Sequence, residues 1–228
     1  MILGIPIHQL FLRGKGMSVK LNIGLSVYSK VPDEEEIEFL KTNRKDTCDV
    51  CGTPNSGLEF FPLCDDGAWY NACSLCHYVQ NLDRVPSMSK GNIIFLPTLT
   101  QQELSVFLRI YWSVEFIVSR TKVSIEEKEL KNSLSVIQKL IEQRHKKAGT
   151  YYGKGIQYVE ATIGFLNLMP PEKYKLRDRL YGDLRWVPDK EAFQSEISWW
   201  SSEVFNIIEA GAIRNNIDAF ISRLGAKE

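Results

Sequence analysis

The chain has 228 residues, and its 44% hydrophobic content is enough to fill the buried core of one large domain or two small ones. Twenty-eight Lys and Arg residues balance twenty-eight Asp and Glu residues, so the sequence lacks the positive charge expected of a dedicated nucleic-acid-binding protein. No stretch reaches the roughly 18 apolar residues needed to span a bilayer, because Arg109 and Glu115 interrupt the longest apolar region. We therefore expect a soluble, cytoplasmic protein without direct membrane insertion.

The N-terminal residues divide into a tail and the start of a folded domain. Residues 1–16 are apolar, but they lack an early positive region and a small-residue cleavage site, so export is not expected. Residues 19–27 alternate apolar and polar side chains with the period of a half-buried strand. The sequence predicts a tail over residues 1–16 and a domain that begins with a strand near Met17.

Four of the five cysteines form two Cys-x-x-Cys pairs, Cys48 with Cys51 and Cys73 with Cys76. An odd number of cysteines without a signal peptide favours a reducing compartment, where such pairs usually hold metal as thiolates. Two residues between ligands let one tight turn direct both sulfurs at one ion, and Gly52 can supply the left-handed backbone that such a turn often needs. We expect one structural zinc per chain, bound by these four cysteines.

Two other interpretations of the cysteines are weaker. A redox pair would need a thioredoxin-like βαβ context, which the sequence does not show. The cysteines can also be small buried apolar residues. The fifth cysteine, Cys64, is expected to be a plain core or turn residue, because four ligands already fill a tetrahedral site.

The segment between and after the cysteine pairs predicts a β-hairpin followed by a short helix. Residues 57–70 read "GLEFFPLCDDGAWY", with an Asp-Gly step at the turn, and the helix begins after Cys73. The order knuckle, hairpin, helix is that of the ββα or treble-clef unit on which HNH nucleases are built. Phe60 and Phe61 occupy the region of the first strand where those enzymes carry their catalytic histidine. No imidazole is available there to activate water, so we expect no enzyme activity and no catalytic residues.

His77 is the one histidine that lies close in sequence to the cysteine pairs. It can serve as an alternative zinc ligand or as a base. The favoured interpretation is that His77 lies on the surface, or that it contacts the metal ligands without binding the metal itself. A single imidazole cannot supply both a base and the metal ligands of a nuclease.

Downstream residues predict a buried strand over 93–96 and a helix that starts at a capping box formed by Thr100 and Glu103. A second box over residues 124–127 starts another helix, which we expect Gly149 to terminate. Basic side chains near the end of that helix are interpreted as partners of its own C-terminal dipole rather than as a phosphate site: Arg144, Lys146 and Lys147. The glycines of residues 149–155 lack Walker A spacing and indicate a linker.

Further helices are predicted over residues 159–168, 172–180, 189–209 and 213–224. In the third of these, six apolar residues fall within roughly 50° of one direction at about 100° per residue, and they are Phe193, Ile197, Trp200, Val204, Ile207 and Ile208. Trp199 points about 120° away from Phe193, onto a mostly polar face. It is expected either to cover a neighbouring element or to anchor a partner, because Trp is enriched at interface hot spots.

These elements predict an α+β fold in two parts. Residues 17–98 form a zinc-binding unit with an HNH-like ββα or treble-clef core and flanking strands. Residues 99–228 form a helical region that packs on this unit and shares its core.

The chain resembles the IcmJ/DotN family of the Dot/Icm type IVB secretion system. The resemblance rests on the zinc knuckles, on "GNIIFLPTLTQQEL" at residues 91–104, on "LRWVPDKEAFQSEISWW" at residues 184–200, and on their order, and it runs from about Val19 to Ile208. It implies a non-catalytic scaffold or adaptor of the cytoplasmic coupling complex, located at the inner membrane face through that complex. The implied partners are the C-terminal extension of the coupling-protein ATPase and other subunits of the complex, and the implied role is substrate recruitment for secretion or conjugative transfer.

Two alternative functions come from other classes. One is a zinc-dependent nucleic-acid-binding protein of conjugation, which would normally present a basic face that this balanced charge does not promise. The other is an HNH-type endonuclease, which needs imidazoles that the sequence lacks. Nucleic acid is therefore an unlikely partner on sequence grounds.

Overall fold

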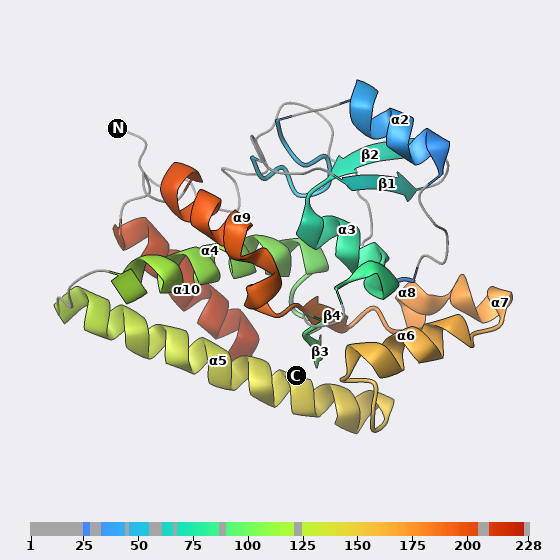
Figure 1. Cartoon of the computed structure of the whole chain (residues 1–228). Helices are drawn as coiled ribbons and strands as arrows, with labels where there is room; N and C mark the ends of the chain where they lie inside the picture. Colours follow the sequence, from blue (N-terminus) through green and yellow to red (C-terminus); the bar gives the residue numbers. More distant parts are fainter. Residues whose placement is uncertain are drawn as a thin grey trace.

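The computed structural model describes residues 25–27, 33–43, 46–54, 61–65, 68–86, 90–120, 125–204 and 210–225. The predicted tail over residues 1–16 and most of the predicted strand over 19–27 lie outside these ranges. The described residues form a mixed α and β fold in which helix predominates, as Figure 1 shows. None of the helices within these ranges combines the length and the apolar character that crossing a bilayer requires.

The first part of the fold is a small hairpin flanked by helices. Its elements are α2 (Glu34–Thr42), β1 (Phe61–Asp65), β2 (Ala68–Ala72), α3 (Ser74–Gln80) and the 3-10 turn η1 (Leu82–Arg84). β1 and β2 are antiparallel, with Asp65 opposite Ala68, which confirms the predicted hairpin. Its turn at residues 66–67 lies outside the described ranges. The sequence analysis did not identify α2, which places the Phe39 ring 5.7 Å from the ring of Trp69 on β2.

A second pair of strands joins distant parts of the chain. The predicted strand is present as β3 (Asn92–Phe95), and it pairs antiparallel with β4 (Leu184–Val187), which the sequence analysis missed. Ile93 lies opposite Trp186, and both side chains are buried. This pairing connects the region before residue 98 with the region after it.

Two long helices and a third packed against them make up most of the remaining fold: α4 (Gln101–Arg120), α5 (Ile125–Tyr152) and α10 (Ala210–Gly225). The capping box at the start of α4 is confirmed. The Thr100 N–H donates to Glu103 Oε2 at 2.8 Å, and the Glu103 N–H donates to Thr100 Oγ1 at 3.2 Å. The side chains of the box predicted at Ser124 and Glu127 lie outside the described part.

The predicted end of α5 at Gly149 is wrong. The helix continues to Tyr152 and stops before Gly153, which has a φ of +99°. A glycine inside a helix costs only about 1 kcal/mol, so the packing of α5 against β3 can carry the helix through Gly149. The linker is therefore shorter than expected.

Arg144 does not serve the end of its own helix, contrary to the sequence-based interpretation. Its guanidinium is buried and donates from Nε and Nη2 to the carbonyl oxygen of Leu224, at 2.9 and 2.7 Å. Leu224 lies in the last turn of α10, where carbonyl groups lack partners within the helix. The cation therefore stabilises the C-terminus of a neighbouring helix, a contact that the local sequence pattern does not contain.

The C-terminal region is more broken than the sequence predicts. Its elements are α6 (Val159–Asn167), α7 (Pro171–Tyr174), α8 (Arg177–Leu180), the 3-10 turn η2 (Lys190–Phe193), α9 (Gln194–Trp199) and the π-helical turn η3 (Trp200–Val204). The predicted helix over 172–180 is two short helices, and that over 189–209 changes type twice within its described residues. Phe193, Ile197 and Trp200 are buried as predicted, whereas residues 207 and 208 and the side chain of Val204 are outside the description.

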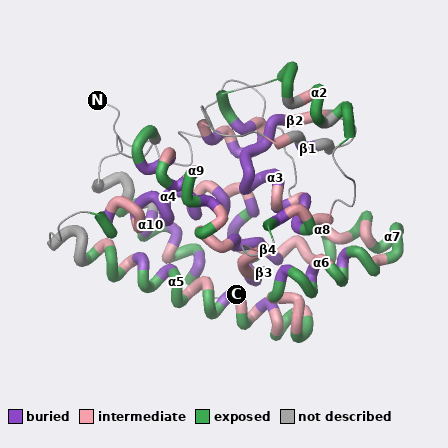
Figure 2. Tube along the Cα trace, in the orientation of Figure 1, coloured by how far each residue is buried: buried purple, intermediate pink, exposed green. Residues whose placement is uncertain are grey.

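The two parts share one hydrophobic core. Figure 2 shows buried residues concentrated on α3, on β3 and β4, and along α4. The Tyr78 ring of α3 lies 6.4 Å from the rings of both Trp186 on β4 and Phe193 on η2, so aromatic contacts continue from the hairpin unit into the C-terminal region. The helical region thus packs directly on the cysteine-bearing unit.

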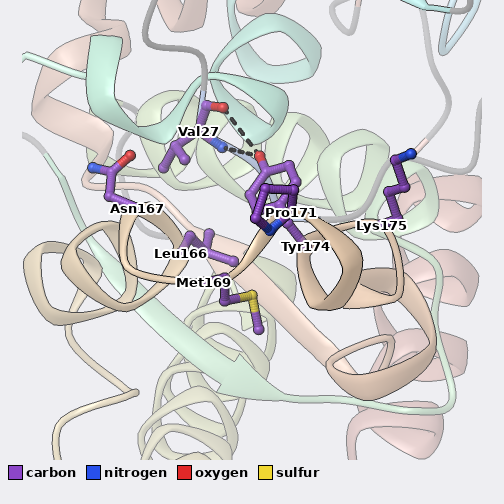
Figure 3. Close-up of a pocket in the computed structure, with 7 residues that line it drawn as sticks. All are labelled: Val27, Leu166, Asn167, Met169, Pro171, Tyr174 and Lys175. Atoms are coloured by element: carbon purple, nitrogen blue, oxygen red, sulfur yellow. Dashed lines mark hydrogen bonds between the residues drawn. The ribbon is translucent and has the colours of Figure 1, made fainter.

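The described segment 25–27 is held between the two parts. The Ser26 N–H donates to the carbonyl oxygen of Val79 at 3.2 Å, and the Val27 N–H donates to Tyr174 Oη at 3.1 Å (Figure 3). Tyr174 Oη in turn donates to the Val27 carbonyl oxygen at 3.1 Å. The segment therefore ties the end of α3 to α7.

Gly91 is predicted to be essential for the approach of β3 to β4. Its φ is +71°, and a Cβ atom at this position would meet the Val187 carbonyl oxygen and the Cα of Pro188. We expect Gly91→Ala to lower the free energy of unfolding by more than about 3 kcal/mol. The matched control is Gly153→Ala, which also has a positive φ but has no atom within 4 Å of the added Cβ; we expect it to cost about 1–2 kcal/mol. Denaturant unfolding measures both, and equal losses would contradict the close packing at Gly91.

Candidate metal centre

The first cysteine pair is presented by a tight turn. The Cys48 N–H donates to the Thr53 carbonyl oxygen at 3.0 Å, and the Gly52 N–H donates back to the Cys48 carbonyl oxygen at 2.9 Å. Gly52 has a φ of +69°, which confirms the predicted left-handed backbone after the pair. This turn is tied to β2, because the Asn71 N–H donates to Asp49 Oδ2 at 2.8 Å.

The second pair is presented by the start of α3. Cys73 is the N-cap residue of this helix, and Cys76 lies in its first turn. Residues three apart lie on the same face of a helix, so both sulfurs can point to one side. The Cys73 N–H donates to Cys48 Sγ at 3.3 Å, which brings the helix start against the turn.

The four sulfur atoms meet at one point. Each Sγ lies within 4.8 Å of the other three, and the Cys51 and Cys73 sulfurs are 3.9 Å apart. Tetrahedral zinc with Zn–S bonds of about 2.3 Å separates its sulfurs by roughly 3.8 Å, so this spacing fits a single ion. The four residues are free cysteines with no disulfide among them, and each is at most 2% exposed. The cluster can therefore bind a metal ion away from solvent.

The acidity of the four thiols is strongly perturbed. Burial raises the pKa of Cys48 well above its ordinary value, and hydrogen bonds to the other thiols, followed by burial, raise that of Cys76. Hydrogen bonds from the other three thiols lower the pKa of Cys51 well below its ordinary value. Burial opposes ionisation of Cys73, but hydrogen bonds from Cys48 and Cys76 and the charge of Arg109 lower its pKa. A bound cation would favour the ionised form of all four.

Arg109 completes the site, and the sequence analysis did not identify it as a site residue. It extends from α4, is 1% exposed, and donates from Nη2 to Cys73 Sγ at 2.6 Å. Burial alone would lower the pKa of this guanidinium, but the cysteine sulfurs raise it above its ordinary value. The available signal was a cation within the longest apolar region of the sequence, because an arginine is rarely buried without a partner.

His77 is not a surface residue, contrary to one of the interpretations above. It is buried beside the cluster, and its ring lies 5.0 Å from the Phe61 ring of β1. The group of ligand atoms found among the described residues contains four cysteines and no histidine. Phe61 therefore occupies the hairpin position beside His77, close to the candidate metal centre.

Cys64 and Trp199 are two other residues for which the sequence makes a specific prediction. Cys64 has its backbone in β1, opposite Trp69, and its side chain is outside the description. Trp199 is partly buried and packs against the hydrophobic core, as one of its two interpretations expects. Its role in binding a partner stays a prediction.

An open pocket elsewhere offers little chemistry. It has a volume of about 380 Å³ and is lined by Val27, Leu166, Asn167, Met169, Pro171, Tyr174 and Lys175 (Figure 3). Lys175 is the single charged residue in this lining, and general acid–base catalysis usually needs at least one group that can exchange protons near neutral pH. The cysteine cluster, rather than this pocket, is the candidate site.

Comparison with protein-family models and with curated proteins finds no match to this chain.

We expect the purified protein to contain about one zinc per chain. A closed site of four thiolates contributes a free energy comparable to the whole stability of a small fold, so Cys73→Ser should misfold. Cys64→Ser is the matched control and should keep the metal. Metal analysis by mass spectrometry measures all three proteins. Zinc below about half an equivalent in the wild type, or full zinc in Cys73→Ser, would contradict the assignment.

Proposed function

We propose that the protein is a non-catalytic scaffold, stabilised by a zinc ion that Cys48, Cys51, Cys73 and Cys76 bind. The observation that carries this proposal is that all four sulfurs and the guanidinium of Arg109 are buried inside the shared core. Structural zinc sites fill all four positions with protein ligands, whereas catalytic sites keep one position open for water or substrate. A sealed set of four thiolates supports the structural role.

The arrangement around the zinc supports an HNH-like origin without HNH chemistry. The order of turn, hairpin and helix supports the proposed ββα or treble-clef unit. Phe61 lies in the first strand of this hairpin, in the region where HNH nucleases carry their catalytic histidine. An aromatic hydrocarbon ring can neither take a proton from water nor bind a metal ion there.

We further propose that this scaffold is a subunit of a type IVB secretion coupling complex of the Dot/Icm kind. The two phrases that carry the resemblance to IcmJ/DotN are distant in sequence but adjacent in the fold, because they contain β3 and β4, which pair with one another. Because the two matching segments contact one another in the fold, they support a resemblance over a whole structural unit rather than over two unrelated short motifs. The proposed partner is the C-terminal extension of the coupling-protein ATPase, and the proposed location is the cytoplasmic face of the inner membrane.

The partner is tested by capture of the immobilised C-terminal extension of the ATPase that the same genome encodes. We expect the wild-type chain to bind it and Trp199→Ala to bind about 30-fold more weakly, since loss of a Trp hot spot costs about 2 kcal/mol or more. Because Trp199 is only partly buried against the core, the melting temperature of this variant should fall less than that of Trp200→Ala. Absence of capture by the folded wild-type chain would contradict the proposed partner.

Trp200→Ala is the matched control for Trp199→Ala, because the neighbouring Trp200 is fully buried. We expect it to lower the melting temperature by several degrees, through the cavity that it leaves. If Trp199→Ala lowers the melting temperature in the same way, Trp199 is a core residue. Normal capture by a stable Trp199→Ala variant would remove this residue from the interface.

We also predict that the zinc-loaded protein does not cleave DNA or RNA. The first strand region of the zinc unit contains phenylalanines where a nuclease needs an imidazole. Incubation with plasmid and with RNA in the presence of Mg²⁺ or Mn²⁺ tests this, with an active HNH nuclease as the positive control. Metal-dependent cleavage that His77→Ala abolishes would restore the nuclease interpretation.

A further inference from the structure

Arg109 is a charged residue that is almost completely buried beside the cysteine cluster. Its side chain is buried in the core between the cysteine cluster and Trp200. Nη2 donates to Cys73 Sγ, whereas Nε and Nη1 have no hydrogen-bond partner among the described residues. Burial of a cation without compensating charge is strongly unfavourable, so this position needs an anion nearby.

A cluster loaded with a divalent metal would be such an anion. Four thiolates around a divalent cation retain an excess of negative charge, and here this charge is held in a dry core where screening is weak. The guanidinium supplies the opposite charge and an N–H donor to one ligand sulfur, at 2.6 Å from Cys73. Groups that donate to metal ligands in this way fix the ligands and strengthen metal binding.

The other side of the guanidinium contacts the C-terminal region. Arg109 Cζ lies 5.1 Å from the centre of the Trp200 ring, within the range of a cation–π contact. Trp200 is fully buried and is the first residue of the π-helical turn η3, and α4 packs against both α9 and η3. One side chain on α4 therefore contacts the second cysteine pair and the end of α9.

We propose that Arg109 is the built-in counter-ion of the metal centre, a positioning residue that couples metal occupancy to the packing of α4 against α9 and η3. The inference rests on the zinc site of the proposed function and does not depend on the secretion partner. The coupling is reciprocal. If Arg109 increases the affinity for the metal by some factor, the bound metal increases the equilibrium constant for burying Arg109 against Trp200 by the same factor.

The first test measures zinc affinity by competition with a chromophoric chelator. We expect Arg109→Met, which keeps an unbranched side chain but removes the charge and the donors, to bind zinc about tenfold or more weakly. Arg109→Lys retains the charge without the planar fork, so its affinity should lie between those of Arg109→Met and the wild type.

Arg144→Met is the matched control. Arg144 is also a buried arginine on a long helix, but its guanidinium donates to the end of α10. Its replacement should lower the melting temperature and leave zinc affinity at the wild-type value. Wild-type affinity in Arg109→Met would overturn the proposal, and so would an equal loss of affinity in Arg144→Met.

A second measurement needs only the wild-type chain, and so holds even if Arg109→Met fails to fold. On zinc removal, hydrogen exchange of peptides from residues 194–204 should speed up more than that of peptides from α6 (Val159–Asn167), because the bound metal stabilises the Arg109 contact with Trp200. An equal increase in both sets of peptides would show general unfolding and would overturn the coupling. Unchanged exchange there would overturn the coupling. A wild-type chain without zinc would overturn the metal centre and this inference together, whereas failure to bind the ATPase extension would overturn only the proposed partner.

Discussion

The fold depends on the close approach of four cysteine sulfurs, which come from separate segments and lie together in the buried core. A tight turn presents two of them, the first turn of α3 presents the other two, and Arg109 reaches the same point from α4. In small metal-dependent folds the binding of zinc to such thiolates releases about 10–16 kcal/mol, which is comparable to the whole stability of a domain. The apolar core alone therefore need not hold these segments together.

The core extends this constraint to the rest of the chain. α3 carries Cys76 on the side of the cluster and Tyr78 toward Trp186 of β4, so the helix that carries a clustered cysteine also packs against the second sheet. β4 pairs with β3, and α5 packs on β3. A continuous core of this kind is consistent with the proposed scaffold function, because many proteins that bind partners through preformed surfaces change little on binding.

Local sequence signals identified the four cysteines that cluster and several element boundaries, whereas long-range contacts could not be predicted from them. Cysteine spacing, the left-handed Gly52 and the Thr100–Glu103 box each depend on a few neighbouring residues. β4 has only four residues, and its identity as a strand comes from pairing with β3 across the chain. Arg144 and Arg109 are both cations on long helices, but their partners lie in α10 and at Cys73, and tertiary packing alone determines this.

X-ray absorption spectroscopy at the zinc edge of the purified protein distinguishes a sealed four-thiolate centre from an open site, because it reports the atoms bound to the metal. We expect four sulfur atoms at about 2.3 Å from zinc, with no nitrogen or oxygen donor. A spectrum that requires a nitrogen or oxygen ligand would show an open or histidine-containing site and would contradict a sealed structural centre.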